Sequence, residues 1–122
     1  MTYVVESERM TEVRRGPFGI LRKLVPESLP LGTLNNGQNI ELVSRGGQRW
    51  GMAKLTEDVL EVTPEGDVVV DMGNYRGFQS QVEIPTADGT IIQKIWVGSL
   101  KTNGDLTVRT ADSKESIKFR PQ

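Results

Sequence analysis

From about residue 39 to the C-terminus, apolar and polar residues alternate with a period of two, and turn residues interrupt the alternation. Ile40 and Leu42 alternate with polar residues before the sequence Arg45–Gln48, and one residue separates Trp50 from Met52 after it. Alternation of this kind is typical of β-strands, and a short Gly-containing stretch between two such runs is typical of a hairpin turn. The pattern therefore predicts a hairpin, with Trp50 and Met52 on the same face of its second strand.

The same arrangement recurs along the rest of the chain. Pairs of β-rich runs flank short turn sequences at 59–63 and 67–72, at 79–84 and 90–97, and at 97–100 and 105–110. Leu106 and Val108 alternate with polar residues, and a final run at 116–120 places Ile117 and Phe119 on one face. Successive strands joined by tight turns pair antiparallel. We therefore predict an all-β fold, an antiparallel β-sandwich or small β-barrel built from hairpins.

Residues 1–38 depart from this pattern. Residues 6–15 fit a short helix that ends at Gly16, but its apolar face is small, so the helix would be weak. A strand at 2–6 and another near Glu12 fit nearly as well. The sequence leaves these alternatives open.

Pro17, Pro26 and Pro30 interrupt the apolar residues that follow. Proline lacks a backbone donor and disfavours regular structure before it. We therefore expect residues 1–38 to form an irregular N-terminal arm or cover segment beside an antiparallel β domain at 39–122. An apolar segment of this kind either covers one end of the β-core or docks on a neighbouring subunit.

The run at 91–97 is apolar on both faces. Ile91, Ile95 and Val97 share one face of the predicted strand, and Ile92 and Trp96 share the other. A strand that is buried on both faces needs two covering layers. In a chain of 122 residues the second layer is either the N-terminal segment or another subunit. The predicted interface residues are Phe18, Ile20, Leu21, Leu24, Ile92 and Trp96.

The amino-acid composition limits the kinds of catalytic and metal site that the chain can form, because it contains neither His nor Cys. His is the usual general base near neutral pH, and His and Cys are the usual zinc ligands. Pairs of carboxylates could still act on glycosides, but the acidic residues look like solvent-facing charges of strands and turns. No phosphate-binding glycine motif occurs either. We therefore expect a protein that is not an enzyme and has no metal or other cofactor.

Two loops combine aromatic, Arg and Gly residues, and they raise an alternative function. The first contains Arg45, Arg49 and Trp50, and the second contains Tyr75, Arg76 and Phe78. Arg can bind phosphate and aromatic rings can stack on bases, so these six residues could form the groove of a single-stranded nucleic-acid-binding module. The simpler interpretation is a Gly-Gly turn with solvated arginines and a Trp in the core. Sixteen acidic and fifteen basic residues favour that interpretation, because phosphate binding relies on clustered positive charge.

The remaining features favour a protein that acts through protein–protein contacts. The chain begins without the basic-then-apolar order of a signal peptide and has no apolar run of membrane-spanning length. We expect it in the host cytoplasm or incorporated in a particle, with no membrane partner. The hypothesis is a structural or assembly protein, a homo-oligomer or a subunit of a larger complex such as a virus particle, where it would be a capsid decoration or tail accessory protein.

Overall fold

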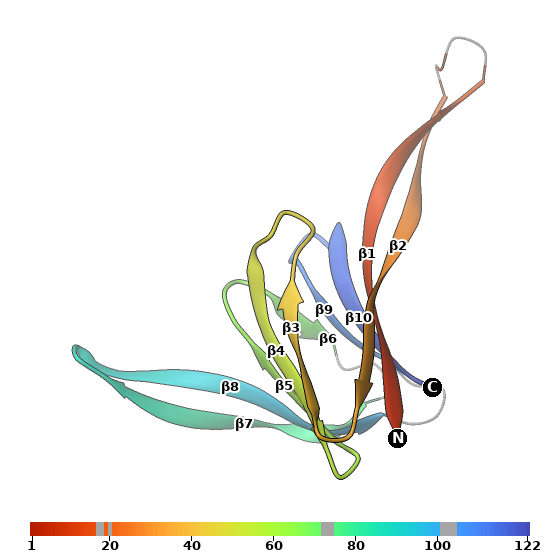
Figure 1. Ribbon diagram of the computed structural model, residues 1–122. Helices are drawn as coiled ribbons and strands as arrows, with labels where there is room; N and C mark the ends of the chain where they lie inside the picture. The colour runs from red at the N-terminus through yellow and green to blue at the C-terminus, as the bar shows by residue number, and fades with distance from the viewer. Residues whose placement is uncertain (17–18, 20, 72–74, 101–104) are drawn as a thin grey trace.

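The computed structural model of the chain describes residues 1–16, 19, 21–71, 75–100 and 105–122. Two antiparallel sheets of five strands face one another, with the strand orders β2-β1-β10-β9-β6 and β3-β4-β5-β8-β7 (Figure 1). The strands are β1 (Thr2–Arg15), β2 (Leu21–Asn35), β3 (Gln38–Val43), β4 (Arg49–Thr56), β5 (Val59–Pro64), β6 (Val69–Asp71), β7 (Tyr75–Thr86), β8 (Gly89–Leu100), β9 (Leu106–Arg109) and β10 (Glu115–Pro121). The predicted all-β antiparallel fold is confirmed, and of its two forms the molecule adopts the sandwich.

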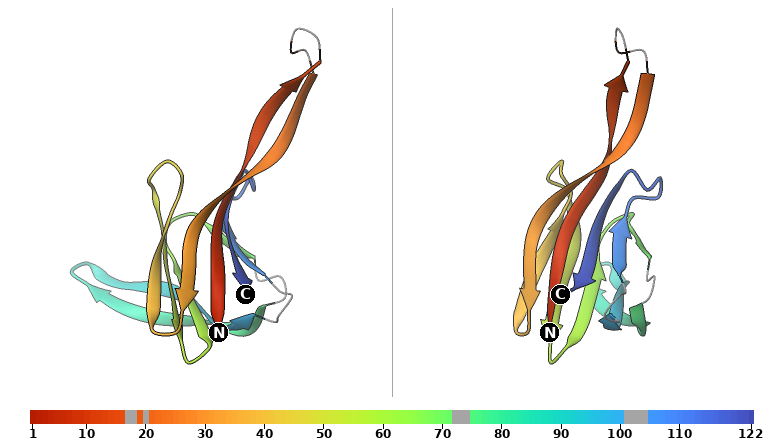
Figure 2. Two further views of the ribbon diagram at one scale, coloured as in Figure 1. Left: turned by 45° about the vertical axis from the view of Figure 1, so that its right-hand side comes forward. Right: turned by 90° about the vertical axis from the view of Figure 1, so that its right-hand side faces the viewer.

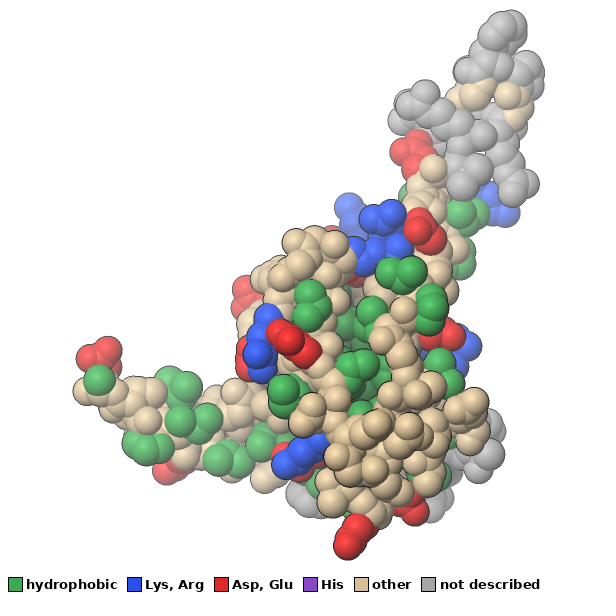
Figure 3. All heavy atoms as spheres, viewed as in Figure 1, with side chains coloured by type: hydrophobic (Ala, Val, Ile, Leu, Met, Phe, Trp, Pro, Cys, Tyr) green, Lys and Arg blue, Asp and Glu red, His purple; other side chains and the backbone are tan. Residues whose placement is uncertain are grey.

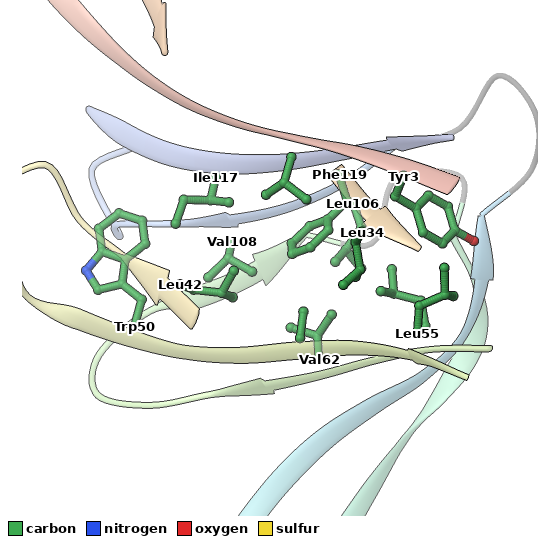
Figure 4. Packing of buried hydrophobic residues seen from close by; sticks show 13 residues of the cluster. Tyr3, Leu34, Leu42, Trp50, Leu55, Val62, Leu106, Val108, Ile117 and Phe119 are labelled. Carbon is green, nitrogen blue, oxygen red and sulfur yellow. The ribbon is translucent and has the colours of Figure 1, made fainter. Parts of the chain in front are cut away.

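The buried core lies between the two sheets (Figure 4). The predicted inward positions of β9 and β10 are confirmed, because Leu106, Val108, Ile117 and Phe119 are fully buried. The first 38 residues share this core. They contribute Tyr3, Val5 and Leu34. The opposite sheet contributes Leu42, Trp50, Ala53, Leu55, Leu60 and Val62.

The expectation of an irregular N-terminal segment is wrong, and of the two alternatives left open for the first 15 residues the structure has a strand and not the helix. β1 pairs with β10 from Tyr3 to Arg9 and with β2 along its whole length. These pairings outweigh the weak helical preference of the sequence. Pro26 and Pro30 lie inside β2, which is the edge strand of its sheet. An edge strand accepts proline because one side of its backbone has no neighbouring strand to bond.

Two predicted hairpins are also wrong. The runs at 59–63 and 67–72 become β5 and β6, which belong to different sheets, and so do β8 and β9. β6 pairs with β9 instead, and Val70 packs against the core from that side. Alternation shows which face of a strand is buried but leaves its neighbour open. Residues 65–68, between β5 and β6, carry the chain from one layer of the sandwich to the other.

The hairpin of β3 and β4 is confirmed, but Trp50 and Met52 lie on opposite faces. A β-bulge interrupts the pairing, because Leu42 pairs with Gly51 while Val43 pairs with Arg49. The extra residue reverses the alternation, so Trp50 points into the core and Met52 is exposed.

Gly51, next to the bulge, has no room for a side chain. A Cβ atom built there would lie 2.1 Å from the carbonyl oxygen of Thr63 and 2.8 Å from the Cα of Pro64. Its φ angle of 135° also lies in the region that other residues avoid. The close approach of β4 and β5 therefore depends on this glycine.

Two long hairpins extend beyond the sandwich, one from each sheet (Figures 1 and 2). Within the described residues, β1 is paired with β10 as far as Arg9, and from Met10 onward β2 alone continues beside it. β8 pairs with β5 from Trp96 to Gly98, and from Ile95 to the turn β7 is the one described strand that forms a ladder with it. Each sheet thus ends in a two-stranded projection.

Candidate interaction surfaces

The β7–β8 hairpin presents its most apolar face to solvent. Cross-strand pairing places Ile84 opposite Ile91, Val82 opposite Gln93 and Ser80 opposite Ile95, so all six lie on one face. None of the six carries a charge. Val82, Ile84 and Ile91 are 42%, 40% and 53% exposed in the folded chain, so the other described elements do not cover them.

The opposite face of this hairpin is the one that continues toward the core. Trp96 lies on it, pairs with Val62 and packs against the buried cluster. Farther out, the same face carries the charged residues Glu83 and Lys94, together with Ile92, which is 61% exposed. A sheet with one buried face usually has a polar outer face. In this hairpin the core side carries Glu83 and Lys94, and the six outer residues carry no charge.

A hollow of about 450 Å³ opens where β8 separates from β5. Its lining includes Pro64, Val68, Ile92 and Trp96. The amide of Gln93 crosses this opening and donates a hydrogen bond to the carbonyl oxygen of Pro64 at 2.9 Å. This bond fixes the base of the hairpin relative to the end of β5.

The β1–β2 hairpin has a smaller apolar surface. Met10 pairs with Pro26, and Leu24 pairs with Glu12, so these residues share one face. Met10 and Leu24 are exposed at 41% and 63%. Because Glu12 lies among them, this face mixes charge with apolar surface.

Arg45 joins the two sheets at the base of the β1–β2 hairpin. Its guanidinium donates hydrogen bonds to the Oγ and carbonyl oxygen of Ser7, at 3.3 and 3.2 Å. It also donates to the carbonyl oxygen and Oε1 of Glu27, at 2.9 and 3.0 Å. The backbone nitrogen of Arg45 donates to Glu115 Oε1 at 2.6 Å. The loop between β3 and β4 is thereby attached to β1, β2 and β10.

The electrostatics of this junction favour the charged form of Glu27. The hydrogen bond from Arg45 lowers the pKa of the Glu27 carboxyl below its ordinary value of 4.5, and the charges of Arg9 and Arg45 act in the same direction. Desolvation opposes the effect in part. Arg9 also forms an ion pair with Glu27 at 3.4 Å. The carboxylate therefore fixes both arginines against the hairpin.

Two further carboxyl groups are held in their charged form at turns. The hydrogen bond from the Asn36 side chain, followed by the N-terminal ammonium, lowers the pKa of Asp58. The hydrogen bond from the Thr110 hydroxyl lowers the pKa of Asp112. The Asn36–Asp58 bond joins the β2–β3 turn to the β4–β5 turn, and the Thr110–Asp112 bond lies within the β9–β10 turn.

Of the predicted nucleic-acid groove, the described residues Arg45, Arg49 and Trp50 do not form a basic surface. The Arg45 side chain is 12% exposed and occupied by the junction, and Trp50 is 3% exposed in the core. Arg49 forms ion pairs with Glu65 at 3.1 Å and Glu41 at 3.6 Å.

The other three residues of that groove, Tyr75, Arg76 and Phe78, are part of β7, but their side chains lie outside the described part of the structure.

The predicted interface residues whose side chains are described do not form one surface. Leu24 and Ile92 are exposed, on different hairpins, whereas Trp96 packs against the core of its own chain. Leu21 begins β2, and its side chain is outside the described residues, as are Phe18 and Ile20 altogether.

Sequence reasoning missed Val82 and Ile84. A signal for them exists, because a two-residue turn at 87–88 places both on the same face as Ile91.

Comparison of the chain with protein-family models, with curated proteins and with solved structures gives no match. Among the described residues, no group of three or more acidic, His or Cys side chains is placed to hold a metal ion. The described part of the chain also contains no helix of the length and apolarity that crossing a membrane requires.

Proposed function

We propose that this protein is a non-enzymatic structural subunit that assembles with further copies of itself through its projecting hairpins. The observation that carries the proposal is the exposed apolar surface on hairpins that extend beyond the sandwich (Figure 3). A larger complex such as a virus particle, in which the protein would be a decoration or tail accessory subunit, is the setting that agrees with this architecture. That setting rests on fold-level analogy.

Hairpin stability supports an assembly role. A two-stranded hairpin in water is marginally stable by itself, because it has no second layer to bury its side chains. The outer parts of β1–β2 and β7–β8 are both of this kind. A neighbouring subunit would supply the missing layer. Burial of apolar surface, which contributes about 25 cal/mol for each Å², would offset the conformational entropy that the strands lose on becoming ordered.

Charge is compatible with self-association. The chain has a formal net charge of −1, so copies do not repel one another strongly. Two arginines of the β3–β4 region, Arg45 and Arg49, form ion pairs with the carboxylates of Glu27 and Glu65 of the same chain. Contacts between copies would therefore depend mainly on apolar burial, and they would persist in salt.

Static light scattering of the full chain in solution tests this proposal, over a range of concentrations up to several hundred micromolar and at low and high salt. We expect a mass above the monomer value of 13.5 kDa that is retained or increased at high salt. A monomer at every concentration and salt would overturn the proposal. Salt-sensitive binding of a labelled single-stranded oligonucleotide by that monomer would instead support the nucleic-acid module.

A further inference from the structure

We infer that the uncharged outer face of the β7–β8 hairpin is the contact with a second copy of this chain, which packs through the same face about a two-fold axis. The face consists of Val82, Ile84, Ile91 and Ile95 with Ser80 and Gln93. The inference deepens the proposed function, on which it rests, by assigning the contact to one face of one hairpin.

The chain's own core cannot cover this face, because the face lies on the other side of the sheet. Trp96 faces the core, and residues at odd positions of β8 therefore point to the other side of the sheet. Ile91 lies on that outer side and is 53% exposed, and the described elements, including the β1–β2 hairpin, leave it uncovered. An outer face that leads away from the core would carry polar residues if it remained in water.

The absence of charge on these six residues indicates which kind of surface can cover them. None of these six residues carries a charge, whereas Glu83 and Lys94 lie on the opposite face of the same hairpin. A covering surface must be equally uncharged, because a buried charge without a partner is costly. Other exposed apolar residues of the described chain lie beside charges, because Glu12 shares the face of Met10 and Leu24, and Met52 lies between Arg49 and Lys54. The best complement that this chain offers to the face is the face itself.

Geometry permits this pairing. Two sheets pack face to face about 10 Å apart when β-branched side chains interdigitate, and Val82, Ile84 and Ile91 are of that type. A two-fold axis lets one patch serve both subunits. The hairpin projects from the sandwich, so its outer face can meet a copy (Figure 2). A single hairpin face is small, below the roughly 1,200 Å² of stable complexes, so the contact belongs to the weak and reversible class.

The test compares two neighbouring isoleucines on opposite faces. Ile91→Lys places a charge on the proposed contact, and Ile92→Lys places the same charge on the other face, at a position that is even more exposed. Sedimentation velocity of the full chain, with concentrations up to several hundred micromolar, measures association of each variant. We expect Ile91→Lys to weaken association at least tenfold and Ile92→Lys to change it less than threefold.

The outcomes separate the inference from the proposed function. If both variants associate as the wild type does, or if only Ile92→Lys weakens association, the outer face is not the contact, although the protein remains an assembly subunit. A wild-type chain that is monomeric throughout would overturn both. Val82→Lys provides a second variant on the outer face, and circular dichroism verifies that each variant is folded.

Discussion

At the scale of single residues, two positions decide how the sandwich is closed. Gly51 allows β4 to approach β5, and Arg45 connects the β3–β4 loop to β1 and β2. Neither role is visible in residue type alone. An arginine next to glycines looks like a ligand-binding residue, but here its donors are used within the chain.

We predict that Gly51→Ala lowers the free energy of unfolding by about 3 kcal/mol or more, because backbone strain and a steric overlap act together. Gly32→Ala is the matched control, since Gly32 has a similar φ of 140° but no atom within 4 Å of the added Cβ. It should cost about 1 kcal/mol from strain alone. Urea unfolding measures both, and equal losses would contradict the steric argument.

We predict that Arg45→Met lowers the free energy of unfolding by about 3 kcal/mol, because it removes several hydrogen bonds and leaves the buried Ser7 without its donor. Arg49→Met is the control from the same region. Its ion pairs are exposed, so it should cost about 1 kcal/mol or less. Urea unfolding at pH 7 measures both, and equal costs would show that Arg45 does not act as a connector.

The same variant has a pH signature. The lowered pKa of Glu27 means that its bonds to Arg45 stabilise the fold above pH 4.5 and that this stabilisation is lost as pH falls through the lower, folded-state pKa. Arg45→Met should bring the Glu27 pKa back toward 4.5 in an NMR titration. It should also reduce the acid-induced loss of stability relative to the wild type, and an unchanged Glu27 pKa would contradict the assignment.

At the scale of elements, the two hairpins differ although both project from the sandwich. The β1–β2 hairpin has prolines on its edge strand and Glu12 on its apolar face, both of which discourage unintended pairing. The six outer residues of the β7–β8 hairpin carry no charge. This contrast is the reason for proposing β7–β8 as the contact between copies.

We predict that shortening β7–β8 abolishes self-association and leaves the sandwich folded. Deleting residues 82–85 and 90–93 removes four cross-strand pairs and preserves the alternation of the remaining strands. The thermal midpoint of the monomer should change by less than about 5 °C, because the core is untouched. Deleting residues 10–13 and 23–26 removes four pairs from β1–β2 as the matched control.

Light scattering and thermal unfolding of both deletions decide this prediction. The control should still associate. Loss of association in the control alone would transfer the contact to the β1–β2 hairpin.

At the scale of the whole molecule, the two projecting hairpins leave from different sheets (Figure 2). A contact through one of them leaves the other available for a different neighbour. Because the contacts proposed are apolar and the net charge is −1, higher salt should strengthen association slightly. Steep weakening by salt would indicate that charged groups dominate the contact.

The sequence by itself determined the all-β class, the inward faces of β9 and β10, and the hairpins β3–β4 and β7–β8. These features depend on local alternation and turn chemistry, which neighbouring residues specify. The candidate surface was partly predictable too, since Ile91 and Ile92 were recognised as apolar on opposite faces of one strand.

Only the tertiary structure decided which strands far apart in the chain are neighbours. Pairing of β1 with β10, and the passage from β5 to β6 between sheets, depend on contacts between residues far apart in sequence. Such contacts also override local signals, as they do for the weak helix and the prolines of the first 38 residues. Contacts between distant residues also bury Trp50 and engage the hydrogen-bond donors of Arg45 within the chain. The exposure of a side chain depends on the elements that pack against it, which the local sequence does not specify.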